Sequence, residues 1–188
     1  MDAFESLISM LLRHQGYWTT PSFKVELTKE EKVRIGKASS PRWEIDLVAY
    51  KGATNEVLAV ECKSFLDSRG VIFRNGRFET EKQYKLFSYP TLRSVVLRRL
   101  AHQLRASGAC PTLARPTLCL AIGKIANVTN RAELKQHFER GNWRLFDPEW
   151  VFEQLSKASE QGYENDVAFV VSKLLLRNKE LLKKYYGD

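Results

Sequence analysis

Two acidic residues and a lysine stand on two neighbouring apolar stretches of this 188-residue sequence. Asp46 lies in WEIDLVAY, and Glu61 and Lys63 lie in VLAVECK. Both stretches are rich in β-branched and aromatic residues, and the turn-like segment KGATNE separates them, which predicts a β-hairpin. If Tyr50 pairs with Val57, the same register places Asp46 opposite Glu61.

Opposed positions of this kind have Cβ atoms about 4.5–5.5 Å apart. Two carboxylates that close repel each other unless a cation or a proton lies between them. Mg²⁺ suits such a pair, because it binds one or two carboxylates and keeps water and phosphate oxygens as its other ligands. Lys63 lies two positions beyond Glu61 on the same face, where its ammonium could orient or deprotonate a water or offset charge on a phosphate. These are the parts needed to hydrolyse a phosphodiester.

The hairpin register also predicts two chemically different faces. Glu44 would lie opposite Lys63, either as an alternative metal ligand or, as we favour, as the group that neutralises the lysine. The other face would be wholly apolar and would form the single buried face of the hairpin. Its members are Ile45, Leu47, Ala49, Leu58, Val60 and Cys62.

Asp46 followed by Glu61-Cys62-Lys63 on consecutive strands resembles the pattern of the PD-(D/E)XK nucleases, the restriction-endonuclease-like superfamily. The resemblance covers about residues 1–125, and Ile45 stands where many members have proline. It implies an endonuclease that hydrolyses DNA with Mg²⁺, for which Mn²⁺ can substitute. Asp46, Glu61 and the main-chain carbonyl of Cys62 would hold the metal, while Lys63 would assist the attacking water.

The resemblance adds two further candidate site residues. Many members carry a glutamate on the first helix, and Glu5 in FESLISMLL matches that position as a further metal ligand. Some members carry a glutamine on the helix after the motif strand, and Gln103 in RRLAHQL is the candidate for it. Both assignments rest mainly on the resemblance.

The remaining sequence predicts the elements that would hold this site. Apolar residues from Phe4 to Leu12 follow helical spacing, with Asp2 as a cap and Gly16 as the end. Asn75-Gly76 predicts a hairpin turn, and residues 28–41 are expected to form a loop or an irregular hairpin. The other expected elements are strands at Phe23–Leu27 and Thr117–Ile122, and helices at Pro90–Ser107, Arg131–Arg140, Pro148–Ala158 and Glu164–Lys184.

Helices that alternate with strands predict an α/β protein with a central mixed β-sheet flanked by helices. We expect a single domain over residues 1–188. Its restriction-endonuclease-like core would span about residues 1–125, and a helical C-terminal extension would span about residues 126–188.

The charge of the chain favours a polyanionic partner. Lys and Arg number 30 against 22 Asp and Glu, a net charge of +8, and the sequence pI is about 9.4. Nucleic acid is therefore the expected partner, and the resemblance favours DNA over RNA. Tyr84 could stack on a base. The candidate phosphate contacts are Arg74, Arg77, Lys82, Lys85, Arg93, Arg98 and Arg99.

Cysteine usage and hydropathy bear on location. The three cysteines lack the spacing of a disulfide framework, and the sequence shows no secretory signal, which together predict an intracellular, cytoplasmic protein. No apolar run of about 18 residues occurs, so no membrane partner is expected. A homodimer or a partner protein could supply specificity. The alternative hypothesis is a non-cleaving nucleic-acid-binding or adaptor module with the same fold.

Overall fold

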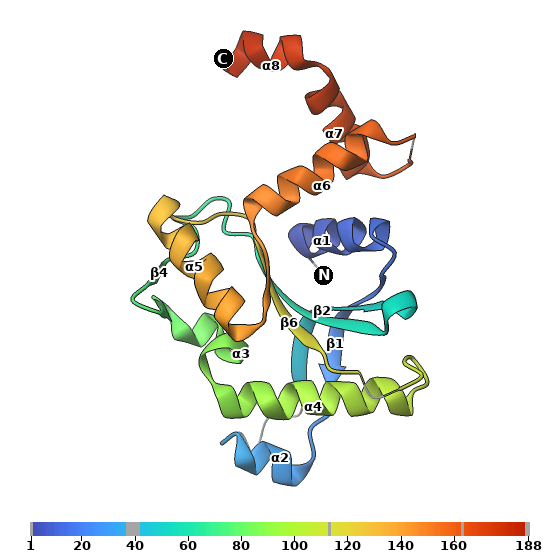
Figure 1. The fold of residues 1–188 in the computed structure, drawn as a ribbon, viewed down its shortest axis with the longest axis vertical. Coiled ribbons are helices and arrows are strands. Elements are labelled where there is room, and N and C mark those ends of the chain that lie inside the picture. Colours follow the sequence, from blue (N-terminus) through green and yellow to red (C-terminus); the bar gives the residue numbers. More distant parts are fainter. Residues whose placement is uncertain (1, 37–41, 113, 163, 187–188) are drawn as a thin grey trace. The chain divides into compact units, whose positions relative to one another are not determined.

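The computed structural model describes residues 2–36, 42–112, 114–162 and 164–186 (Figure 1). The chain divides into two compact units, Met1–Asp147 and Pro148–Asp188. The first unit holds the sheet and extends past residue 125, where the helical extension was expected to begin. It does so because a helix and a strand between residues 128 and 146 pack with the sheet.

The sheet of the first unit has five strands in the order β1-β2-β3-β6-β7. The first three strands are antiparallel and the last three are parallel, so the predicted mixed α/β sheet is confirmed. The strands are β1 (Trp18–Val25), β2 (Trp43–Lys51), β3 (Glu56–Lys63), β6 (Thr117–Ile122) and β7 (Arg144–Phe146). The sequence predicted β1 about five residues too late and did not predict β7.

The pairing of β2 with β3 follows the predicted register. Tyr50 pairs with Val57, and the ladder continues as far as Leu47 and Val60. The turn between the strands is closed by Asn55, which adopts a left-handed φ of 50° and accepts a 3.1 Å hydrogen bond from the Tyr50 hydroxyl. This register fixes which residues of β2 and β3 lie side by side farther from the turn.

The predicted single buried face of the hairpin is wrong. Val48 and its partner Ala59 are as buried as Leu47 and Val60, which point to the opposite face. Helices cover both sides of the sheet, so both sets of side chains are removed from water.

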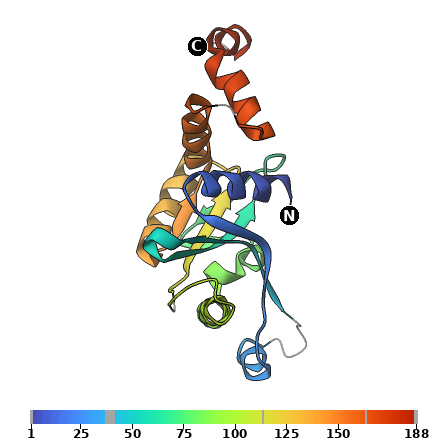
Figure 2. The same cartoon turned by 90° about the vertical axis from the view of Figure 1, so that its right-hand side faces the viewer.

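Helix α1 (Ala3–His14) lies on one face of the sheet and α4 (Pro90–Ala106) lies on the other (Figure 2). A capping box opens α1: the Glu5 N–H donates to Asp2 Oδ1 at 2.8 Å, and the Asp2 N–H donates to Glu5 Oε2 at 3.1 Å. Pro90 begins α4, because the fixed φ of proline suits the first position of a helix. The buried face of α4 carries Leu92, Val96 and Leu100.

Two shorter elements lie at the margins of the sheet. Residues 29–34, predicted as loop, form α2 (Lys29–Arg34) behind a Thr28–Glu31 capping box. Residues 37–41 of that prediction lie outside the described residues. The predicted Asn75-Gly76 hairpin is present as β4 (Phe73–Arg74) and β5 (Arg77–Phe78).

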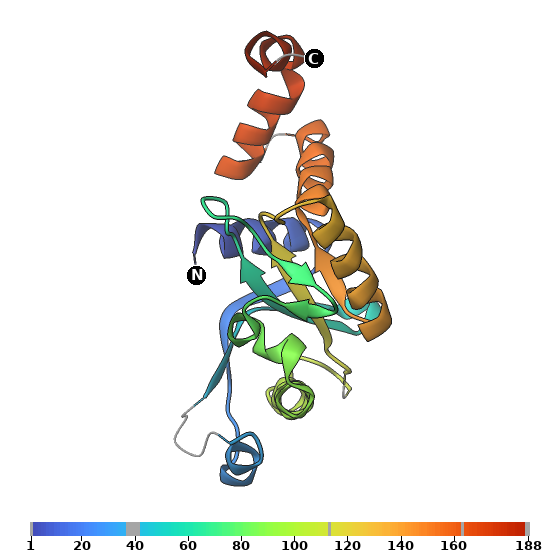
Figure 3. The ribbon, with the colours of Figure 1, turned by 90° about the vertical axis from the view of Figure 1, so that its left-hand side faces the viewer.

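Helix α5 (Val128–Gly141) holds this hairpin in place (Figure 3). The Phe73 N–H donates to Asn130 Oδ1 at 2.6 Å, and the Asn75 N–H donates to Glu133 Oε2 at 3.0 Å. Two short helical segments, η2 (Glu81–Gln83) and α3 (Lys85–Ser88), connect the hairpin to α4.

The second unit is helical and consists of α6 (Pro148–Glu160), α7 (Val167–Arg177) and α8 (Lys179–Tyr186). The helix predicted over residues 164–184 is therefore two helices, which meet at Asn178. Arg177 Nε donates to the Ser159 carbonyl at 2.6 Å and joins α7 to α6. Among the described residues, no helix has both the length and the apolar composition needed to cross a membrane.

Candidate active site

Asp46 lies where the ladders on both sides of β2 are interrupted. The pairing with β3 ends at Leu47, and the pairing with β1 passes from Pro21 to Phe23 without joining Ser22 to Asp46. Asp46 Oδ2 instead accepts a 2.7 Å hydrogen bond from the Cys62 main-chain N–H. The carboxylate therefore replaces a ladder partner at the point where β2 and β3 part, and it lies beside the end of β3.

The Lys63 ammonium lies close to the carboxylates of Asp46 and Glu61. Its Nζ lies 3.7 Å from Asp46 Oδ2 and 4.0 Å from Glu61 Oε2. The exposed fraction of the side chain is 22% for Lys63, 23% for Asp46 and 16% for Glu61. All three are therefore mostly buried but still in contact with solvent. The structure thus brings Asp46, Glu61 and Lys63 together as the sequence predicted.

Glu61 is the most perturbed of the three. Its pKa is raised from 4.5 to about 7, first by burial and then by the charge of Asp46, while the charge of Lys63 offsets part of the rise. Glu61 Oε1 is buried and accepts no hydrogen bond from any described residue. An unpaired buried carboxylate oxygen is unfavourable, and a proton or a cation would satisfy it.

These donors fit a hard divalent cation. The described residues contain no group of three or more His, Cys, Asp or Glu side chains arranged around a metal. Mg²⁺ does not need one, because it usually takes one or two carboxylates and completes its shell with water and substrate oxygens. Asp46 Oδ2 and the unpaired Glu61 Oε1 supply carboxylates of that kind.

Glu5 lies within the electrostatic range of this cluster. Burial raises the pKa of Glu5, the capping hydrogen bond from Asp2 lowers it, and the charge of Asp46 is among the causes that raise it. The charge of Glu5 in turn raises the pKa of Glu61. The first helix therefore places an acid within electrostatic range of the site, although one oxygen of Glu5 serves the helix cap.

Cys62 contributes only its main chain. Its side chain is buried, and burial raises the pKa of the thiol far above its ordinary value. A neutral, buried thiol is neither a nucleophile nor a metal ligand.

Two candidates for the site have other contacts. Gln103 Oε1 accepts from the Glu26 N–H and its Nε2 donates to the Lys24 carbonyl, both at 2.9 Å, so its amide joins α4 to the chain at the end of β1. Glu44 forms an ion pair with Lys24 on β1 rather than with Lys63, because the ladder to β3 has already ended. The predicted pairing of Glu44 with Lys63 is therefore wrong, whereas Gln103 as a catalytic group stays a prediction that these contacts do not support.

The predicted basic group divides into internal and exposed members. Arg93 donates to the Leu86 and Phe87 carbonyls at 3.1 and 3.0 Å and lies over the Trp143 ring at 4.7 Å, contacts that do not favour its predicted role as a phosphate contact. Arg99 donates to the Glu26 carbonyl at 2.8 Å. The others lie at the surface or are half-buried: Arg74, Arg77, Lys82, Lys85 and Arg98.

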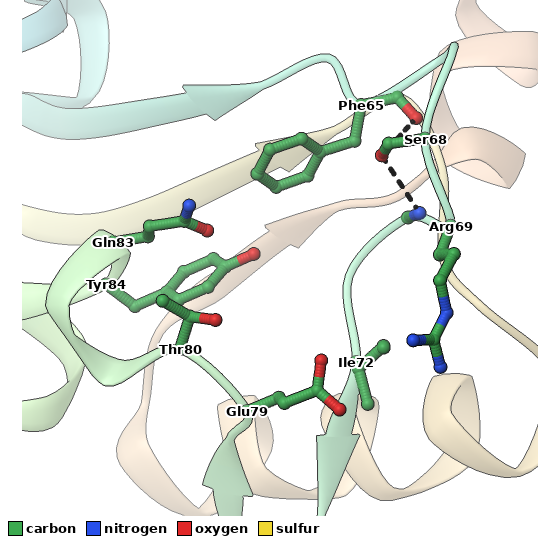
Figure 4. A pocket seen from close by; sticks show the side chains of 9 residues that line it. Phe65, Ser68, Arg69, Ile72, Glu79, Thr80, Gln83 and Tyr84 are labelled. Carbon is green, nitrogen blue, oxygen red and sulfur yellow. Dashed lines mark hydrogen bonds between the residues drawn. The ribbon is translucent and has the colours of Figure 1, made fainter.

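A hollow of about 440 Å³ was missed by the sequence reasoning. Phe65, two residues after Lys63, lines it together with Tyr84 (Figure 4). The ring of Tyr84 is stacked on Phe78, with the ring centroids 3.9 Å apart. No spacing in the sequence signals this hollow, because its walls come from a loop after β3 and from the segment before α4.

The sequence matches no protein-family model, and it matches no curated protein. Among solved structures, the crystal structure of a protein of unknown function, AF1548, is similar to this one with a TM-score of 0.41 and 13% sequence identity. The similarity covers 96% of this chain and 97% of that chain.

Proposed function

We propose that this protein is a Mg²⁺-dependent nuclease that hydrolyses phosphodiester bonds in DNA. The observation that carries the proposal is the convergence of Asp46, Glu61 and Lys63 around a buried carboxylate oxygen that no described residue satisfies. Structural ion pairs usually satisfy their buried oxygens, whereas a metal-binding carboxylate keeps one for the cation.

Four groups would hold the metal. They are the carboxylates of Asp46 and Glu61, the main-chain carbonyl of Cys62, and Glu5 from α1. When bound, Mg²⁺ would supply Lewis-acid stabilisation of the charge on the phosphate, and Mn²⁺ can take its place.

The residues of the chain supply the rest of the chemistry. The Lys63 ammonium, within about 4 Å of both carboxylates, would orient the attacking water and offset charge that develops on the phosphate. Limited exposure of the three side chains strengthens these interactions, because electrostatic forces are weaker in bulk water. The Cys62 N–H fixes the position of Asp46 before substrate arrives.

The proposal includes a restriction-endonuclease-like core. What supports it is the order of elements, a helix followed by three antiparallel strands, a helix and a parallel strand, with the acids on the middle strands. The exposed basic residues support DNA as the polyanion. All three cysteines are free thiols in the structure, which favours a reducing, cytoplasmic location.

The test is cleavage of supercoiled plasmid with Mg²⁺ or Mn²⁺ and with EDTA. We expect metal-dependent nicking by the wild type and loss of nicking in Asp46→Ala and Lys63→Ala, with DNA binding largely kept in Lys63→Ala. Each variant is purified in parallel with the wild type, so that a contaminating nuclease would cut in every sample. Nicking that persists in Asp46→Ala overturns the proposed site, and tight DNA binding without any cutting favours the non-cleaving module.

A further inference from the structure

The hollow after β3 is bounded by a loop of fixed conformation. The Gly123 N–H donates to the Lys63 carbonyl at 3.0 Å, and the Val71 N–H donates to the Lys124 carbonyl at 2.9 Å. Gly70 lies between these contacts with a φ of 82°, where a Cβ atom would approach the Lys124 carbonyl to 2.9 Å. Only glycine fits there without strain. The loop that leaves Lys63 is therefore held against the end of β6.

Within this loop Phe65 has an unusual backbone. Its φ is 46°, a conformation that bulky residues rarely adopt. Ser68 stabilises it, since the Ser68 hydroxyl donates to the Phe65 carbonyl at 3.0 Å and accepts from the Gly70 N–H at 3.1 Å. The strained conformation directs the phenyl ring to the wall of the hollow (Figure 4). Strain of this kind is concentrated at functional sites.

The hollow is also lined by polar groups that the fold does not use. The side chains of Arg69, Glu79 and Gln83 form no hydrogen bond or ion pair with any described residue. Figure 4 shows the Glu79 carboxylate and the Tyr84 hydroxyl directed into the space that the Phe65 ring borders. The hollow thus combines an aromatic surface with a donor, an acceptor and an amide that can do both. Its volume of about 440 Å³ is in the range of small-molecule sites.

We propose that this hollow takes an unpaired nucleobase of the DNA strand that is cut at the acidic site. The Phe65 ring would stack on the base, and Glu79 and Gln83 would bond its polar edge. Arg69 would lie toward the neighbouring phosphate. Phe65 lies only two residues beyond Lys63 in the chain, so one strand can reach both places. This inference rests on the proposed nuclease function and names its substrate class.

The substrate class follows from the geometry of base pairing. A base that is paired and stacked in a duplex cannot enter a side pocket unless it leaves the stack, and leaving is easiest where the base is already unpaired. DNA with frayed ends, gaps or flaps is then the preferred substrate. Supercoiled plasmid also qualifies, because negative supercoiling favours strand separation.

Binding can be measured apart from cutting. The probe is a DNA duplex with a single-stranded flap that carries 2-aminopurine, whose fluorescence changes on stacking, and EDTA prevents cleavage. We expect a fluorescence change with the wild type, and an affinity about tenfold to hundredfold lower in Phe65→Ala. Leu66→Ala is the matched control, because Leu66 is the next residue in the same loop, is exposed, and does not line the hollow. It should bind as the wild type does.

Gln83→Ala tests the same site without a risk to folding, since Gln83 is exposed. It should also weaken flap binding, with an unchanged melting temperature. The inference is overturned if both Phe65→Ala and Gln83→Ala bind the flap as tightly as Leu66→Ala does. It is also overturned if free 2-aminopurine nucleotide binds as tightly as the flap.

The two proposals fail separately in these experiments. If nicking depends on metal but neither Phe65→Ala nor Gln83→Ala weakens flap binding, the nuclease proposal stands and the base-pocket proposal fails. Flap binding that needs Phe65, together with nicking that persists in Asp46→Ala, removes the acidic site as the place of cleavage and with it the placement of the pocket beside it.

Discussion

The main-chain N–H of Cys62 donates a 2.7 Å hydrogen bond to the carboxylate of Asp46. That bond stands where the β2–β3 ladder would continue, so one acid both ends the ladder and lies at the proposed metal position. The site is therefore assembled by the hairpin itself. The Lys63 amine and the Glu61 carboxylate follow within two residues of the same strand.

Glu61 should make the stability of the metal-free protein depend on pH. Its pKa in the folded protein is about 7, above the ordinary 4.5, so the folded state holds more protons than the unfolded state between these values. The free energy of unfolding then falls as pH rises from about 4.5 to about 7, by up to about 3 kcal/mol. Glu61→Gln should remove this slope, as measured by urea denaturation in EDTA at pH 5 and pH 8. Equal slopes in the variant and the wild type would contradict the assignment.

Mg²⁺ should stabilise the protein more at high pH than at low pH. A proton on Glu61 competes with the cation, so affinity should fall below about pH 7, where the carboxyl is protonated. At 100 times its dissociation constant the ion should add about 2.7 kcal/mol to the free energy of unfolding.

Thermal melting with MgCl₂ or EDTA at pH 6 and pH 8 measures this effect of Mg²⁺. Glu44→Gln should respond as the wild type does, because Glu44 is paired with Lys24 on β1. Glu61→Gln should lose the response, and a full response in that variant would argue against the site.

Gln103→Ala should lower stability and leave cleavage intact. The substitution leaves the Glu26 N–H and the Lys24 carbonyl without their amide partner, which should cost about 1–3 kcal/mol in the free energy of unfolding. His102→Ala, at the exposed neighbouring position, is the control. Denaturation curves and cleavage rates per folded molecule separate the two effects. A large loss of rate at unchanged stability would restore Gln103 to the site.

The exposed arginines of the β4–β5 hairpin should act on DNA affinity. Arg74 and Arg77 are paired across the two strands, and a phosphate near them would relieve their mutual repulsion. Replacing both with alanine should lower the slope of log affinity against log salt by about one for each phosphate that the protein no longer neutralises.

Arg93→Ala is the contrast for that experiment. Its guanidinium is held over Trp143 and against two carbonyls, so its removal should lower stability by about 2 kcal/mol and leave the salt slope unchanged. Salt titrations of binding to one duplex measure both variants. If Arg93→Ala changes the salt slope and the double variant of Arg74 and Arg77 does not, then Arg93 contacts phosphate and the hairpin arginines do not, the reverse of what we expect.

The hairpin that carries the acids could be predicted because it depends on local information. Alternation and the turn segment fixed the pairing of Tyr50 with Val57, and the place of Asp46 follows from that pair. Asn75-Gly76 was equally local, since both residues adopt the positive φ that such a turn requires. The Thr28–Glu31 capping box was a signal for α2 that the charged composition of the segment hid.

Errors arose where tertiary contacts decide the outcome. Polar alternation does not reveal that helices cover both faces of the sheet, so Val48 and Ala59 were not expected in the core. A glutamine or an arginine on a helix carries no mark of whether it binds substrate or main chain, and in the structure Gln103 and Arg93 bind main chain. The three residues of β7 are too few for a periodic pattern.

The most direct test of the central claim compares two acids two positions apart on β2. Asp46→Asn keeps an oxygen that can accept from the Cys62 N–H but removes the charge, whereas Glu44→Gln removes a charge that faces Lys24. With Mg²⁺ and supercoiled plasmid, we predict that Asp46→Asn slows cleavage by at least about a hundredfold while Glu44→Gln cuts at the wild-type rate. Cleavage by Asp46→Asn at the wild-type rate would contradict the account.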